Sequence, residues 1–244
     1  MSLPSIAVIN FTSTLHDQDV QDAIRVVNRQ VLEDFVPLWG YGRLLQLHAV
    51  DFRPADPDTL APQKVPADSA MYLVDEASLP GALGFHDLNT RDVPVGFVFV
   101  LDPQDWTVTL SHEVLDLILD PTVNLSVPGP DPRNVANLVL HTYEACDAVE
   151  RFSYTIDGIA VSDFLTPSYF TIGEAPGTRN DFLQHCVRTQ FVTLSRAHLV
   201  RPAPHALNSC CVVRAGWRSP RREPRPGVLA KPSIPFARNR CTHL

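Results

Sequence analysis

The chain has 244 residues, of which 45% are hydrophobic and 19% are charged, so it is long and apolar enough to bury a sizeable core. It contains no run of about 18 apolar residues and no basic segment at its start, so we expect neither a membrane-spanning helix nor a secretory signal. Five cysteines without a CxxC pair indicate free thiols, which predicts an intracellular, cytoplasmic protein.

The net charge of −7 is unevenly distributed along the chain. Residues 1–200 contain 11 basic and 26 acidic residues, a net charge of −15, whereas residues 201–244 contain nine Lys/Arg and one acid. An acidic body disfavours nucleic acid as a partner and is compatible with cations. The basic segment has seven prolines and little periodicity, which predicts a disordered Pro/Arg-rich tail after a domain of residues 1–200. Alternatively, the tail is a polyanion-binding arm or the product of a shifted reading frame.

The first third of the chain predicts strands around one long helix. From residue 17 to just before Pro37, apolar residues recur at spacings of three and four, which is typical of an amphipathic helix. Residues 53–68 contain four prolines and predict a loop. Short runs rich in β-branched and other apolar residues predict strands at residues 5–11, 44–50 and 71–75.

The next segments predict a hairpin followed by a helix. Residues 81–87 and 94–100 are β-rich runs separated by a turn, so we expect them to pair. Ser111 is a suitable N-cap, and a helix is predicted from there through Asp120, ended by Pro121.

Beyond this helix, the sequence predicts a loop, a second helix and further strands. Proline-rich residues 127–132 predict the loop, and residues 134–150 predict a helix that bears His141, Glu144, Asp147 and Glu150. Residues 159–167, after the Asp157-Gly158 turn, predict strands that pack beside this helix.

The predicted helix at 111–120 carries the most informative motif, His112-Glu113 followed by Asp116. Residues four apart lie on one face of a helix, so His112 and Asp116 can point at a single ion. Glu113 stands where the HExxH zinc peptidases keep the carboxylate that activates a metal-bound water.

The order of these elements and the HExxD motif resemble a zincin metallopeptidase of the gluzincin type over residues 5–150. The resemblance implies an α+β domain with α/β character at its start, built from a mixed sheet, a backing helix, a motif helix and a glutamate helix. It also implies that His112 is a metal ligand, Glu113 the general base and Glu144 the third ligand. Asp116 takes the place of the second histidine, and Asp147 is a substitute ligand or orients one.

The implied metal is zinc (Zn²⁺), but a site with one histidine and several carboxylates is harder, so Mn²⁺, Mg²⁺ and Ca²⁺ are alternatives. The predicted function is metal-dependent hydrolysis of a peptide or amide bond, with a peptide or protein as substrate. One alternative is a non-catalytic zincin-like module that keeps the fold and acts in binding or structure. Another is that the motif arises by chance, in which case Asp116 is solvated.

Two further candidates have ordinary structural explanations. His86-Asp87 at a strand end can meet substrate or polarise a carbonyl, but such a pair more often stabilises a turn. Cys146 can be a ligand or a nucleophile, but a buried thiol without such a role is the favoured interpretation. No pattern in the sequence predicts the oligomeric state.

Overall fold

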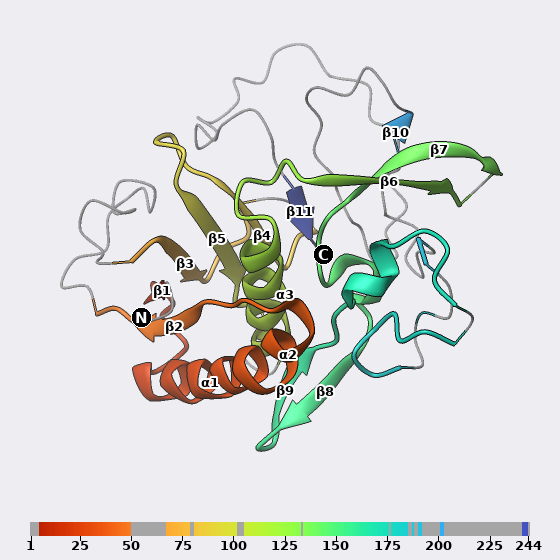
Figure 1. Cartoon of the computed structure of the whole chain (residues 1–244). Coiled ribbons are helices and arrows are strands. Elements are labelled where there is room, and N and C mark those ends of the chain that lie inside the picture. Colours follow the sequence, from red (N-terminus) through yellow and green to blue (C-terminus); the bar gives the residue numbers. More distant parts are fainter. Residues whose placement is uncertain are drawn as a thin grey trace, which may run out of the picture.

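The computed structural model describes residues 5–49, 67–78, 81–101, 105–132, 134–175, 177–184, 187, 190–191, 201–202 and 241–243. Most of the predicted loop at 53–68 and most of the predicted disordered tail lie outside these residues. The described part of the chain has an α+β architecture with a mixed sheet at its centre (Figure 1).

The central sheet has six strands in the order β11-β4-β5-β3-β1-β2. β1 pairs in parallel with β2 and β3, β3 pairs in parallel with β5, and β4 runs antiparallel to β5 and to β11. The predicted strands and the predicted hairpin are therefore confirmed. The strand bounds are Ser5–Asn10 (β1), Leu44–Leu47 (β2), Ser69–Val74 (β3), Gly84–Leu88 (β4), Pro94–Phe99 (β5) and Cys241–His243 (β11).

The backing helix is longer than predicted. It comprises α1 (Asp17–Arg29), a π-helical segment (Gln30–Phe35) and α2 (Val36–Trp39), and it ends at Gly40, whose φ of 79° suits glycine. The helix continues past Pro37, which lies directly after the π-helical segment, where the pattern of backbone hydrogen bonds changes.

Helices cover one face of the sheet, and aromatic side chains pack together on the other. Apolar residues of α1 and of α3 (Trp106–Leu119) form one core with alternate residues of β1, β3 and β5. The opposite residues of the same strands form a second buried cluster in which Phe97 stacks on Tyr72 and Phe85. This alternation is the two-residue period of strands with two buried faces.

Residues 126–142 form a hairpin that the sequence analysis missed. β6 (Ser126–Asp131) and β7 (Asn134–Thr142) pair antiparallel, and β10 (Arg201–Pro202) pairs with β7. The predicted loop at 127–132 and the predicted helix at 134–150 are therefore wrong. Prolines are tolerated in β6 because it is an edge strand of this sheet.

After β7 the chain forms a 3-10 turn, η3 (Asp147–Val149), then β8 (Ser153–Ile156) and β9 (Ile159–Ser162), and a second 3-10 turn, η4 (Pro167–Phe170). β8 and β9 pair around Asp157 and Gly158, both at positive φ, which confirms the predicted turn.

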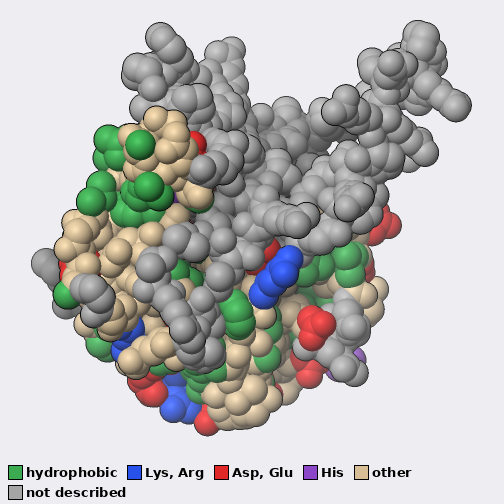
Figure 2. Space-filling view, turned by 90° about the vertical axis from the view of Figure 1, so that its right-hand side faces the viewer, with side chains coloured by type: hydrophobic (Ala, Val, Ile, Leu, Met, Phe, Trp, Pro, Cys, Tyr) green, Lys and Arg blue, Asp and Glu red, His purple; other side chains and the backbone are tan. Residues whose placement is uncertain are grey.

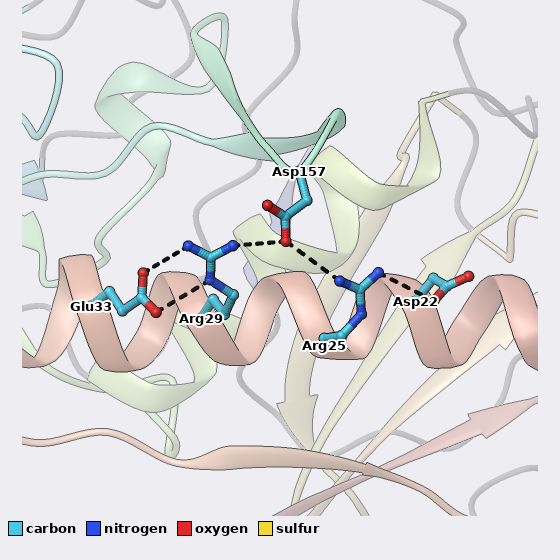
Figure 3. Close-up of polar contacts among 5 residues, drawn as sticks. All are labelled: Asp22, Arg25, Arg29, Glu33 and Asp157. Atoms are coloured by element: carbon cyan, nitrogen blue, oxygen red, sulfur yellow. Dashed lines mark hydrogen bonds and ion pairs between the residues drawn. The ribbon is translucent and has the colours of Figure 1, made fainter.

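The β8–β9 hairpin is attached to α1 by an ion-pair network on the surface (Figure 3). Asp157 Oδ2 lies 2.7 Å from Arg29 Nη1 and 3.4 Å from Arg25 Nη1. Arg29 also pairs with Glu33, which is one turn further along the helix. The network connects the turn of the hairpin to the backing helix.

Charged side chains are scattered over the part of the surface that the structure describes. On the face shown in Figure 2, charged side chains form small separate groups among apolar and uncharged ones. Among the described helices, none has the length and apolar character needed to cross a membrane.

Candidate metal centre

Other elements bury both the polar and the apolar residues of the motif helix α3. It packs against β4 and β5 on one side and β9 on the other (Figure 1). Every residue from Leu110 to Leu119 is buried, including His112, Glu113 and Asp116. The expectation for a chance motif, a solvated Asp116, is therefore wrong, because the helix lies inside the molecule. Charged groups buried in this way need partners or an ion.

Ser111 is an interior residue of α3 and not its N-cap. The helix begins at Trp106 with Asp105 as the N-cap residue, because apolar residues extend the helical pattern upstream of the motif. The Ser111 hydroxyl donates to Gln30 Oε1 at 3.0 Å and accepts the N–H of Ser162 at 2.8 Å. Gln30 Nε2 in turn donates to the Ser162 carbonyl at 2.8 Å. This closed network fixes α3 against the backing helix and β9 directly before His112.

His112 faces two carboxylates. Its Nε2 lies 3.1 Å from Asp116 Oδ2, one turn along α3, and 3.5 Å from Asp147 Oδ1 at the start of η3. Two ligands at about 2 Å from one ion are separated by about 3 Å, so the separation of His112 from each carboxylate is one that two ligands of an ion can have. Of the predicted ligands, Asp116 and Asp147 are thus the two that contact His112.

Glu144, the preferred third ligand from the resemblance, is placed differently from the expectation. No glutamate helix exists in the described residues, and Glu144 is buried in the segment that joins β7 to η3. The contact with His112 comes from Asp147, three residues further along the chain.

Cys146 lies beside the same three side chains. Its N–H donates to Asp116 Oδ1 at 2.8 Å, and its Sγ forms a cluster with the ligand atoms of His112 and Asp116 in which all atoms lie within 4.8 Å of one another. The thiol is fully buried. Sequence reasoning favoured a thiol without a role here, because Asp116 and Cys146 are 30 residues apart and only the fold brings them together.

Glu113 points towards β4. His86 Nδ1 lies 3.6 Å from Glu113 Oε2, and His86 Nε2 lies 3.3 Å from the Asp120 carbonyl oxygen. A Cβ on Gly84 would lie 2.7 Å from Glu113 Oε1, so the carboxylate is packed against the backbone of β4. Of the predicted pair His86-Asp87, His86 therefore contacts the candidate base.

A small pocket of about 50 Å³ reaches these residues. It is lined by His112 and Glu113 of α3, by Glu150, and by Gly84 of β4, with Leu83, Val108 and Thr109. A space of this size has room for water. Water can therefore lie next to both the candidate ligand and the candidate base.

The electrostatics of the site favour positive charge. Burial alone would lower the pKa of His112, but the carboxylates of Asp116, Asp147 and Glu113 outweigh burial and hold this pKa well above its ordinary value. Burial, reinforced by Asp116, raises the pKa of the Cys146 thiol.

No family model matches the chain, and the search of curated proteins found no match.

Proposed function

We propose that the chain is a metal-dependent hydrolase with a zincin-like domain, acting on a peptide or amide bond. The observation that carries the proposal is the convergence of Asp116 Oδ2 and Asp147 Oδ1 on His112 Nε2 inside the molecule. His112, Asp116 and Asp147 would hold the ion. Zinc is the proposed metal, and Mn²⁺, Mg²⁺ and Ca²⁺ are the alternatives.

Two features of the fold support the zincin-like assignment. The motif helix lies next to an antiparallel strand, β4, which belongs to a mixed sheet backed by a long helix. Glu113 directly follows the candidate ligand His112 and lines the same pocket. The described elements differ from the zincin layout in one respect, because they include no glutamate helix. In this proposal the Asp147 carboxylate at η3 takes the place of that glutamate.

A bound divalent ion would supply Lewis acidity and would make an attacking water more acidic. Glu113 would accept the proton of that water on its carboxylate and later deliver it to the leaving amine. His86 would hold the Glu113 carboxylate in place from β4. The enclosed surroundings would strengthen each of these charge interactions by excluding bulk water.

The second candidate function is a non-catalytic binding module that keeps the fold and the ion. The small volume of the pocket favours this alternative, because about 50 Å³ accommodates water and not a peptide. The two candidates share a metal centre and differ in turnover.

Metal analysis of the purified protein, combined with turnover on a panel of peptide and amide substrates, separates the candidates. We expect one equivalent of metal in wild type and in Glu113→Gln, and loss of metal in His112→Ala. Glu33→Gln, an exposed change of the same kind, is the matched control. Turnover that disappears in Glu113→Gln with metal retained supports the hydrolase, and metal without turnover supports the module. Absence of metal from wild type after incubation with each cation would refute both.

A further inference from the structure

Cys146 supplies two different groups to the candidate centre. Its backbone N–H holds Oδ1 of Asp116, which leaves Oδ2 of the same carboxylate facing His112 Nε2. Its own Sγ lies in the cluster formed with His112 and Asp116. The residue is fully buried and immediately precedes Asp147, so the chain enters η3 with successive residues at the cluster.

We propose that Cys146 is a metal ligand, which makes the centre a His/Asp/Cys site for zinc or a chemically similar divalent cation. The inference rests on the metal centre of the proposed function and deepens it by specifying the sulfur ligand and hence the class of metal. On binding, the sulfur–metal bond forms as the S–H bond breaks, the nitrogen–metal bond forms as His112 gives up any proton on its ligating nitrogen, and these protons leave to the buffer. The divalent cation is the only co-reactant that this step requires, and no group is oxidised or reduced.

The geometry fits such a site. Zinc bonds of about 2.3 Å to sulfur and about 2.0–2.1 Å to nitrogen or oxygen, arranged tetrahedrally, separate the donor atoms by roughly 3.5 Å. The three donors already lie within 4.8 Å of one another, so small side-chain movements bring them to these separations.

The charges fit as well. Neutral His112, one carboxylate and one thiolate balance a divalent cation, and the fourth position of the tetrahedron stays available to Asp147 or to a reactant. A metal ion deprotonates a coordinated thiol outright, which offsets the cost of a buried thiolate.

The chemistry of sulfur predicts the preference of the site. Thiolate is a soft ligand that favours zinc and related transition metals, whereas Mg²⁺ and Ca²⁺ prefer oxygen. A large excess of Mg²⁺ should therefore leave bound zinc in place.

Cobalt(II) provides a direct test, because a sulfur–cobalt bond gives a charge-transfer band in the near ultraviolet. The full-length chain, stripped of metal with a chelator, is titrated with Co²⁺ and then with Zn²⁺. We expect the band in wild type and in a control that carries Cys186→Ser, Cys210→Ser, Cys211→Ser and Cys241→Ser, which keeps only Cys146. In Cys146→Ser the band should vanish, and zinc affinity should fall by more than about tenfold, since even a residue outside the ligand set can cost that much.

The outcomes separate this inference from the proposed function. Cobalt bound without the band in wild type, with binding lost in His112→Ala, would overturn the role of Cys146 and leave the metal centre intact. Absence of cobalt and zinc binding in wild type would overturn both proposals. If Cys146→Ser does not fold, the control that keeps only Cys146 decides: a band there supports the ligand, and cobalt bound without a band refutes it.

Discussion

At the scale of single residues, the most informative fact is that this protein buries several acids around one histidine. His112, Asp116, Asp147 and Glu113 are all buried. Burying a charge without a partner is costly, so such a cluster persists where the groups balance one another or hold an ion. The raised pKa of His112, which these carboxylates cause against the opposing effect of burial, reports the same excess of negative charge.

The variant Asp116→Asn tests the role of the carboxylate at nearly constant shape. The amide oxygen can still accept the N–H of Cys146, so the local backbone contact survives. The charge that faces His112 is lost. We expect zinc affinity to fall by more than about tenfold, because loss of a residue that only orients a ligand already costs about that much. Calorimetric titration measures this, and Asp22→Asn on exposed α1 is the control. Unchanged affinity in Asp116→Asn would exclude Asp116 from the coordination sphere.

At the scale of elements, the position of α3 is set by the network of Ser111, Gln30 and Ser162, which joins the backing helix, the motif helix and β9. All three residues are buried, so each lost hydrogen bond leaves a polar group without water. Because Ser111 directly precedes His112, the network holds the backbone of α3 in place at the candidate ligand.

Replacing Ser111 by alanine removes the donor to Gln30 and the acceptor of the Ser162 N–H. We expect the free energy of unfolding to fall by about 1–3 kcal/mol, the cost of leaving a buried polar group unsatisfied. Urea unfolding measures this value, with Ser153→Ala, a change of the same kind at an exposed position of β8, as the control. A loss below about 0.5 kcal/mol would show that the network does not hold α3.

The contact between α1 and the β8–β9 turn predicts a dependence of stability on pH. The Arg29 guanidinium lowers the pKa of Asp157, and Arg29 likewise lowers the pKa of Glu33. A lowered folded-state pKa stabilises the protein above the unfolded-state pKa of about 4, and the contribution is lost as the pH falls through the folded-state value. We expect Asp157→Asn to be less stable than wild type at pH 7 and equally stable near pH 2, since asparagine also tolerates positive φ. Denaturant melts across this range measure it, and a difference that persists at low pH would contradict the ion-pair explanation.

The elements also show which parts of the site a sequence can predict. The four-residue spacing of His112 and Asp116 predicts their shared face, because helix geometry is local. The helix predicted over residues 134–150 is wrong because Val135, Leu138 and Val139 fit helical spacing, whereas in the structure the buried residues Val139 and His141 lie two apart on β7, the central strand of its sheet. The contacts of His112 with Asp147, of Asp116 with Cys146 and of Glu113 with His86 join distant segments, and no local pattern encodes them.

At the scale of the whole molecule, all residues of the candidate centre lie within residues 1–200, on the acidic part of the chain. Residues 201–244 contribute two described segments, β10 and β11, which pair through their backbones with β7 and β4. These are five residues at sheet edges. The predicted disordered tail, residues 201–244, lies outside the described residues apart from these two strands.

A chain that ends after Val200 should therefore fold and keep the metal centre. We expect Tm to fall by less than about 4 °C, equivalent to about 1 kcal/mol for a protein of this size. Removing nine bases and one acid also changes the net charge from −7 to −15, so cation binding should be retained or strengthened. Thermal melts and zinc titrations of both chains measure this, and a larger drop in Tm would show that the tail packs on the domain.

We propose that one divalent ion lies between α3 and η3, and anomalous diffraction at the zinc edge would locate it. Crystals of the full-length protein grown with zinc would be measured above and below the edge. We expect a single strong anomalous peak about 2.0–2.3 Å from His112 Nε2 and an oxygen of Asp116. A map without a peak at this position, or with zinc only at other histidines, would contradict it.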